Sequence, residues 1–245
     1  MLQLYGLHYS PWTEKARWAL DVSNLSYEYI EYLPMLTTPI LAIRTGNLFG
    51  KITVPLLFTD TGHVSESMPI AQYAAKRGRD SLFPSGKDKE IKKWNDLSET
   101  ALRAARAMVI EKTARSHGAK QEALPALTPD GLRPVLTPVA ELGLWYLRWK
   151  HHTSVVPIHE QKIILRKTLD EIARHLKDGR KFILDEFSFA DICVAVIIQS
   201  IAPVGDHFLP LDKFTRDVWS EPDLAKEYKP LVDWRDTIYG NHRNY

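Results

Sequence analysis

A change of pattern near residue 80 constrains the fold of this chain more than any other feature. Before it, short alternating runs typical of strands and runs with helical spacing follow one another. After it, only apolar stripes at helical spacing remain. Residues 78–88 between the two parts are rich in glycine, proline, serine and charge. The sequence therefore predicts an α/β domain over residues 1–80, a linker at 81–88 and an all-helical domain over 89–245.

The first domain is expected to be a compact unit with a mixed sheet. Its predicted order is β-α-β-loop-β-β-α, with strands and helices at residues 2–6, 11–22, 27–32, 54–58, 63–65 and 67–76. Asp60-Thr61-Gly62 is a tight-turn sequence that would join two of the strands as an antiparallel hairpin. Residues 33–50 are interrupted by proline and glycine, so we expect an irregular segment that can include one short helix.

The second domain is expected to consist of amphipathic helices. Ser188 to about Ile201 is apolar nearly all round, which predicts a buried central helix, and Ser188-Phe189-Ala190-Asp191 is a capping box at its start. Trp145 and Trp149 are four residues apart on another predicted helix, and we interpret them as core packing. The tail from 221 to 239 predicts a last helix. Four prolines in residues 115–140 are expected to break any long helix there.

The composition excludes several classes of protein. The 245 residues include 32 Lys and Arg against 30 Asp and Glu, a net charge of +2, so neither nucleic acid nor a membrane is an expected partner. The single cysteine, Cys193, permits no internal disulfide and is expected to be a core thiol in a reducing compartment. No targeting segment or membrane-length apolar run appears. We therefore expect a soluble, cytoplasmic protein.

A first candidate site is Ser10, followed by Pro11, at a predicted helix start. Pro11 suits the first helical position and Ser10 the cap. The unpaired N–H groups of a helix start favour an anion, including a thiolate. The alternative is a structural cap without further function.

Two further candidates precede the next strand and the next helix. In Thr53-Val54-Pro55, a cis bond would leave the backbone of Val54 open to an extended ligand, but X–Pro bonds are mostly trans, so the sequence alone favours trans. In Ser65-Glu66-Ser67, Glu66 could bind an ammonium group, while Ser67 and the helix N-terminus bind a carboxylate. Capping by Ser65 or Ser67 is the alternative.

The histidines give no case for a metal site. His151, His152 and His159 lie near one another in the sequence, but they have no cysteine partner or supporting second layer of ligands. We therefore expect no metal.

Together, in this order and spacing, these motifs resemble the soluble glutathione S-transferase family. The string from Ser10 to Arg17 is similar to the start of the first helix in the serine-type and omega-like classes. Val54-Pro55 resembles the family's cis-proline element, and Glu66-Ser67 resembles the pair that holds the γ-glutamyl end of glutathione. Ser188 to Asp191 resembles the family's capping box. No class assignment follows.

The resemblance implies a thioredoxin-like domain that binds glutathione and a helical domain that covers the second substrate. It implies that Ser10 stabilises the glutathione thiolate, with Tyr9, Tyr5 and Thr13 as rivals. Lys51 could meet the glycyl carboxylate or be a solvated loop lysine, and Trp12 could line the second pocket or pack in the core. It also implies a homodimer.

The implied activity is conjugation of glutathione to small electrophiles in detoxification. Omega-like enzymes carry cysteine where Ser10 stands, so the serine disfavours disulfide reduction and favours conjugation. A glutathione-dependent peroxidase or isomerase and a non-catalytic glutathione-binding member remain the alternatives.

Overall fold

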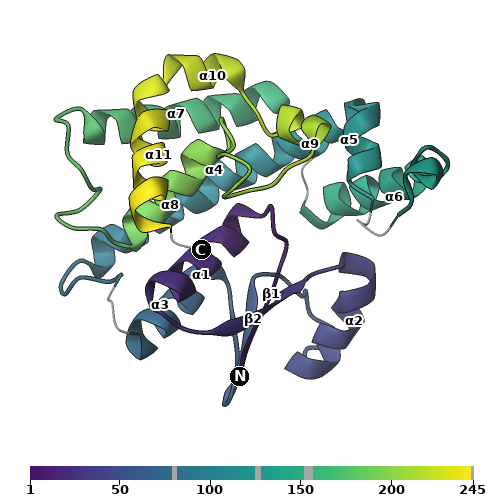
Figure 1. The fold of residues 1–245 in the computed structure, drawn as a ribbon, viewed down its shortest axis with the longest axis horizontal. Coiled ribbons are helices and arrows are strands. Elements are labelled where there is room, and N and C mark those ends of the chain that lie inside the picture. Colours follow the sequence, from purple (N-terminus) through teal and green to yellow (C-terminus); the bar gives the residue numbers. More distant parts are fainter. Residues whose placement is uncertain (79–81, 125–127, 152–156, 244–245) are drawn as a thin grey trace. The chain divides into compact units, whose positions relative to one another are not determined.

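The structure is a computed structural model that describes residues 1–78, 82–124, 128–151 and 157–243. The chain divides into two compact units. The first comprises Met1–Asn95, Arg180–Val196 and Arg235–Tyr245, and the second comprises Asp96–Gly179 and Ile197–Trp234 (Figure 1). Residue 81, where the predicted linker begins, lies outside the described residues, as does His152.

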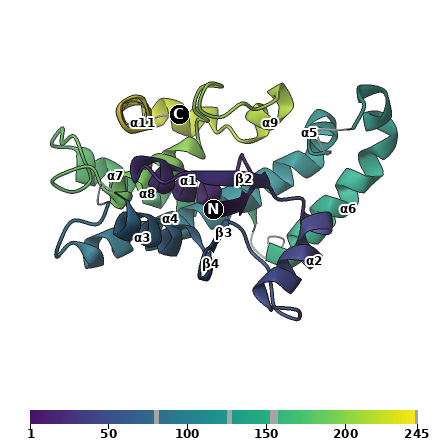
Figure 2. The ribbon, with the colours of Figure 1, turned by 60° about the horizontal axis from the view of Figure 1, so that its bottom comes forward.

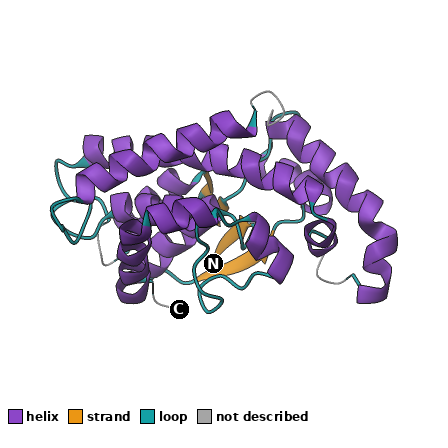
Figure 3. Cartoon of the chain, turned by 90° about the horizontal axis from the view of Figure 1, so that it is seen from above, coloured by secondary structure: helices purple, strands orange, loops and turns teal. Residues whose placement is uncertain are grey.

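A four-stranded mixed sheet forms the centre of the first unit, as the sequence predicts. Its strands are β1 (Leu2–Gly6), β2 (Tyr27–Glu31), β3 (Leu56–Thr59) and β4 (Gly62–Ser65), in the order β2-β1-β3-β4. β1 pairs with β2 in parallel and with β3 antiparallel, and β3 pairs antiparallel with β4. Figure 3 shows these strands, in orange, gathered in one sheet.

Three helices accompany this sheet: α1 (Pro11–Val22), α2 (Pro34–Thr45) and α3 (Ser67–Arg77). The segment 33–50 contains one helix, as the sequence permits, but α2 has 12 residues and leaves irregular structure only at the two ends of the segment. Pro34 occupies its first turn, where a missing N–H costs nothing, and the helix accommodates Pro39 within it. Gly46 at φ 70° ends the helix in the left-handed conformation that glycine adopts readily.

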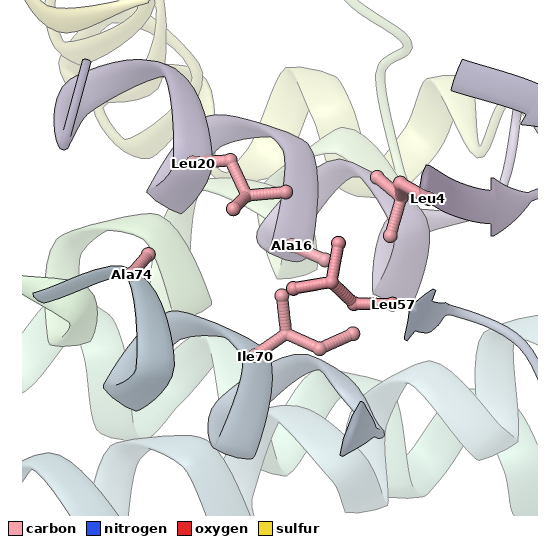
Figure 4. Close-up of a cluster of buried hydrophobic side chains, with 6 residues drawn as sticks. All are labelled: Leu4, Ala16, Leu20, Leu57, Ile70 and Ala74. Carbon is pink, nitrogen blue, oxygen red and sulfur yellow. The ribbon is translucent and has the colours of Figure 1, made fainter. Parts of the chain in front are cut away.

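Alternation along the strands builds two cores, one on each face of the sheet. On one face, Leu4 and Leu57 point toward side chains of α1 and α3, which pack against each other; the cluster consists of Leu4, Ala16, Leu20, Leu57, Ile70 and Ala74 (Figure 4). On the other face, Tyr5, Leu56 and Phe58 pack with Leu41 of α2. The sheet thereby fixes where α1 and α3 begin.

The rest of the described chain is helical, as predicted. Besides a short 3₁₀ turn at Asp130–Leu132, the helices are α4 (Asp88–Arg115), α5 (His117–Glu122), α6 (Arg133–His151), α7 (Ile158–Leu176), α8 (Phe189–Gln199), α9 (Lys213–Val218), α10 (Pro222–Glu227) and α11 (Lys229–His242). The single helix expected over 221–239 is instead two, α10 and α11. None of the described helices has both the length and the apolar composition needed to cross a bilayer.

Two expectations for α6 are wrong. The helix runs through Pro138, so this proline does not break it, although the described residues between α4 and α6 hold only the short α5 and the 3₁₀ turn. Trp145 and Trp149 are 62% and 65% exposed rather than packed in the core. Periodicity finds an apolar face, but it does not say which tertiary partner covers that face.

The start of α8 confirms the predicted capping box and buried helix. Phe189 and the residues from Ile192 to Ile198 are all fully buried, including Cys193. The Asp191 carboxylate accepts hydrogen bonds from the N–H of Ser188 at 2.9 Å, the Ser188 hydroxyl at 3.0 Å and the N–H of Ile183 at 2.7 Å. Burial nevertheless raises the pKa of Asp191 to about 6, against these hydrogen bonds.

Candidate functional site

The pairing of the sheet brings three candidate motifs to one edge. Tyr5 near the end of β1 pairs with Leu56 at the start of β3, and Leu56 pairs with Ser65 at the end of β4. The end of β1, the start of β3 and the end of β4 therefore share one edge of the sheet. Val54-Pro55 directly precedes β3, Glu66-Ser67 directly follows β4, and Ser10 comes four residues after the end of β1. Figure 2 labels β3 and β4 of this sheet.

Ser10 is the N-cap residue of α1, with Pro11 at the first helical position, as predicted. The hydroxyl makes no cap hydrogen bond with the helix, so it is not used in the way the structural alternative requires. The side chain is mostly buried, with the residue 9% exposed. A buried hydroxyl beside helical N–H groups is suited to donating a hydrogen bond to an anion.

The Val54-Pro55 peptide bond is cis, so the expectation of trans from sequence statistics alone is wrong. The Pro55 carbonyl accepts a hydrogen bond from the N–H of Glu66 at 3.1 Å, which joins the two motifs directly. Glu66 lies at φ 72°, a conformation that side-chain-bearing residues rarely adopt. Backbone strain of this kind is concentrated at binding and catalytic sites.

Neither Ser65 nor Ser67 is the cap of α3. The N-cap is Glu66, and its side chain makes no cap hydrogen bond. Glu66 is exposed, whereas Ser67 is only 2% exposed. The structural alternative for this motif is therefore not the observed arrangement.

The alternative hydrogen-bond donors to the thiolate, Tyr5, Thr13 and Tyr9, have different surroundings. The Tyr5 hydroxyl accepts a hydrogen bond from Arg44 at 2.6 Å, on the sheet face that packs with α2. The Thr13 hydroxyl accepts one from the N–H of Leu7 at 3.2 Å. Burial, with a smaller contribution from Glu31, raises the pKa of Tyr9 to about 12, so its phenol remains protonated at neutral pH.

Lys51 and Trp12 lie near the same edge of the sheet. Lys51 is exposed and lines a small pocket of about 50 Å³ whose other lining residues are Thr45, Asn47, Ile52, Thr53, Leu56, His63 and Ser65. Trp12 is half-buried at the second position of α1. Among the described residues there is no group of three or more His, Cys, Asp or Glu side chains that could hold a metal ion.

Three residues of the first unit carry contacts that no sequence motif predicts. Arg243, near the carboxyl end, binds Glu14 of α1 in the core of the first unit. His8 and Glu31 form a pair beside the turn that leads to Ser10. The only sequence signal for His8 is its place between a strand end and a helix start, and none marks Arg243.

Family models identify the chain that carries this fold and site. Residues 9–77 match the glutathione S-transferase N-terminal domain, and residues 145–237 match the glutathione S-transferase C-terminal domain. These two modules, in this order, define a two-domain transferase scaffold with a thioredoxin-like first domain. The chain belongs to the glutathione S-transferase family.

Individual relatives agree with this assignment. A probable glutathione S-transferase of Solanum tuberosum is 33% identical over 72 residues, which are 29% of this chain and 32% of that protein. The chain thus spans about a third of the length of this curated relative.

Solved structures show the same fold over almost the whole chain. A glutathione S-transferase of Methylobacillus flagellatus with glutathione bound has a TM-score of 0.62 at 16% identity, covering 98% of this chain and 95% of that one. A Methylobacterium radiotolerans enzyme in complex with glutathione sulfonate has a TM-score of 0.61 at 19% identity, with coverage of 98% and 91%. The expected fold, a thioredoxin-like domain followed by a helical one, is confirmed.

Proposed function

We propose that this chain is a glutathione transferase that conjugates the thiolate of glutathione to small electrophilic, hydrophobic substrates. The observation that carries the proposal is the Ser10 hydroxyl, mostly buried at the start of α1 and not used to cap it. It lies at the sheet edge where the cis Val54-Pro55 element and Glu66-Ser67 also meet. In this proposal residues 1–80 bind glutathione, 81–88 link the domains and 89–245 form the helical domain.

The Ser10 hydroxyl and the start of α1 can lower the pKa of the glutathione thiol as far as the reaction needs. A free thiol has a pKa near 8.5, and lowering it by about two units requires roughly 2.7 kcal/mol of preference for the anion. A hydrogen bond to a charged group contributes about 1.5–3 kcal/mol. A helix N-terminus adds about 0.3–1 kcal/mol. One serine and one helix end therefore suffice.

The neighbouring motifs would hold the rest of the tripeptide. The backbone of Val54 lies outside the paired residues of β3, so it can pair with the extended cysteinyl segment. Glu66, exposed at the start of α3, would bind the γ-glutamyl ammonium, and Ser67 with the helix N-terminus would bind its carboxylate. Lys51 would meet the glycyl carboxylate, and Trp12 would line the pocket for the electrophile.

Conjugation then proceeds by nucleophilic attack. The thiol loses its proton, the sulfur electron pair forms a bond to the electrophilic carbon, and the leaving group departs with its own electron pair. No metal takes part in this proposal, and glutathione is the co-substrate.

We also propose a cytoplasmic homodimer with a role in detoxification. An exposed apolar stripe along α6 supports the dimer, because a second copy of the chain would bury it. The stripe consists of Val135, Val139, Leu142, Trp145 and Trp149. A single buried cysteine supports a reducing location.

The test compares wild type with Ser10→Ala in a conjugation assay with an aryl halide, together with calorimetric binding of glutathione. We expect Ser10→Ala to lower the conjugation rate about 10- to 100-fold, the equivalent of one hydrogen bond to a charged group, while glutathione still binds. Ser26→Ala is the matched control, because Ser26 is exposed at the opposite edge of the sheet, just before β2.

Other outcomes decide between the alternatives. An inactive wild type that binds glutathione would support a binding protein, and activity with hydroperoxides alone would support a peroxidase. If Ser10→Ala is as active as wild type, Ser10 is not the thiolate donor.

A further inference from the structure

A histidine–carboxylate pair lies beside the turn that leads into α1. His8 is two residues before Ser10, and Glu31 is the last residue of β2. The Nδ1 atom of His8 lies 3.2 Å from Oε1 of Glu31, and the main-chain N–H of His8 donates to the same oxygen at 3.2 Å. Two contacts from one residue hold the imidazole in place against the carboxylate.

The carboxylate of Glu31 is itself held from its other side. The Tyr29 hydroxyl lies 2.8 Å from Oε2 of Glu31 and 3.0 Å from the carbonyl of Gly6. Burial raises the pKa of Glu31, but hydrogen bonds from His8 and Tyr29 outweigh it, and the net pKa is lowered. Glu31 is therefore ionised at neutral pH.

The other groups that face this pair do not compete for its proton at neutral pH. The ring of Tyr9 lies edge-on to His8 at 5.0 Å between ring centres, and its raised pKa keeps it protonated. The guanidinium of Arg17 lies over the ring of Tyr29 at 5.1 Å. It is a permanent cation that neither gives nor accepts the proton.

An ionised carboxylate at Nδ1 selects one tautomer of the imidazole. Nδ1 carries the hydrogen and donates it to Glu31, so the lone pair is on Nε2, at the far side of the ring from Glu31. The side chain of His8 is 47% exposed, so the ring is open to solvent on part of its surface. The arrangement is that of a histidine poised to accept a proton.

The turn keeps this histidine close to the start of α1. The N–H of Ser10 donates to the carbonyl of Leu7 at 2.9 Å, which closes a tight turn with His8 and Tyr9 as its central residues. Cα atoms two residues apart are within about 7.6 Å. The imidazole of His8 and the hydroxyl of Ser10 are therefore side chains of one tight turn.

We propose that His8, oriented by Glu31, is the proton acceptor for the thiol of glutathione bound at Ser10, an inference that rests on the proposed function. The S–H bond breaks, its electron pair remains on sulfur, and the proton binds Nε2 to give an imidazolium beside Glu31. After the S–C bond forms, the imidazolium returns its proton to the leaving group or to water. Ser10 stabilises the anion, and His8 stores the proton.

The proton's destination can be measured without any electrophile. Glutathione binding is followed by calorimetry in buffers of different ionisation enthalpy, which counts released protons, and thiolate formation is followed by ultraviolet absorbance. In wild type we expect thiolate with clearly less than one proton released per site. In His8→Gln we expect each thiolate to release a whole proton, and conjugation to be slower by about 100-fold, the lower end of the range for general-base catalysis.

Two variants complete the test. Glu31→Gln retains the imidazole but removes the charge that holds it, so proton release should rise toward that of His8→Gln. His159→Gln, at an exposed position on α7, is the matched control and should behave as wild type.

Negative results for the role of His8 and for the proposed function are distinguishable. If His8→Gln forms thiolate at the same pH and releases the same number of protons as wild type, His8 is not the acceptor, although the proposed function stands. If wild type neither binds glutathione nor forms thiolate, the proposed function itself fails.

Discussion

Replacement of Arg243 by methionine tests the contact that ties the carboxyl-terminal segment to α1. Nε of Arg243 donates to Glu14 at 2.8 Å, and Nη1 donates to Asp21 at 2.5 Å. The side chain of Arg243 is 0% exposed and that of Glu14 is 9% exposed. Arg243→Met leaves the Glu14 carboxylate buried without the cation that hydrogen-bonds to it, with only the charge of Arg17 acting on it from nearby.

The expected loss follows from this burial. Removal of one partner of a buried ion pair costs about 3–5 kcal/mol, because the remaining charge is neither solvated nor paired. Asp21 is 28% exposed, so we assign it little of this loss. The matched control is Arg115→Met, since the side chain of Arg115 is 72% exposed in its pair with Glu111, and such surface pairs are worth about 0–1 kcal/mol.

Urea unfolding, followed by tryptophan fluorescence and circular dichroism, gives the free energy of unfolding of each variant. The double variant Glu14→Gln with Arg243→Met should be more stable than Arg243→Met alone, because it removes the orphaned charge. An Arg243→Met protein within about 1 kcal/mol of wild type would refute the reasoning. Because Ser10 begins α1, we also expect this variant to bind glutathione less well.

Two further predictions concern stability alone. Burial raises the pKa of Asp191 from 3.8 to about 6, so between these values the native state holds a proton that the unfolded state has lost. Unfolding free energy should therefore fall with rising pH across that window, by up to about 1.4 kcal/mol per pH unit, and Asp191→Asn should remove this slope in urea titrations; an unchanged slope would contradict it. A Cβ on Gly6 would lie 2.3 Å from Cγ2 of Thr13, so Gly6→Ala should lower the free energy of unfolding by about 1–3 kcal/mol. A Cβ on Gly143, within α6, would meet no atom within 4 Å, so Gly143→Ala should raise the free energy of unfolding by about 0.5–1 kcal/mol. Equal melting temperatures for the two glycine variants would refute this comparison.

Much of the fold follows from local pattern. The four strands, α1, α3 and α8 lie within one or two residues of their predicted bounds, because alternation, helical spacing and capping sequences act over a few residues. The capping box at Ser188 could be predicted for the same reason. Two of the errors concern prolines inside α2 and α6. The others concern the exposure of Trp145 and Trp149 and the division of the last segment into α10 and α11, which local pattern does not determine.

The candidate site was predicted only in part. Ser10, Val54-Pro55 and Glu66-Ser67 could be named from sequence motifs because each marks the start of a strand or helix. Their common edge depends on the register of β1 with β3 and of β3 with β4. The unused cap hydroxyl of Ser10 and the left-handed backbone of Glu66 are visible only in the structure.

The sequence by itself determined which segments become strands and helices, that α8 is a buried helix, and which residues lie at the helix starts. Only the tertiary structure decided what those residues meet. His8 and Glu31 are 23 positions apart, and Glu14 and Arg243 are 229 apart. Local preferences act between neighbours along the chain, whereas a buried charge or a hydrogen-bonded histidine acquires its partner only when distant segments pack together.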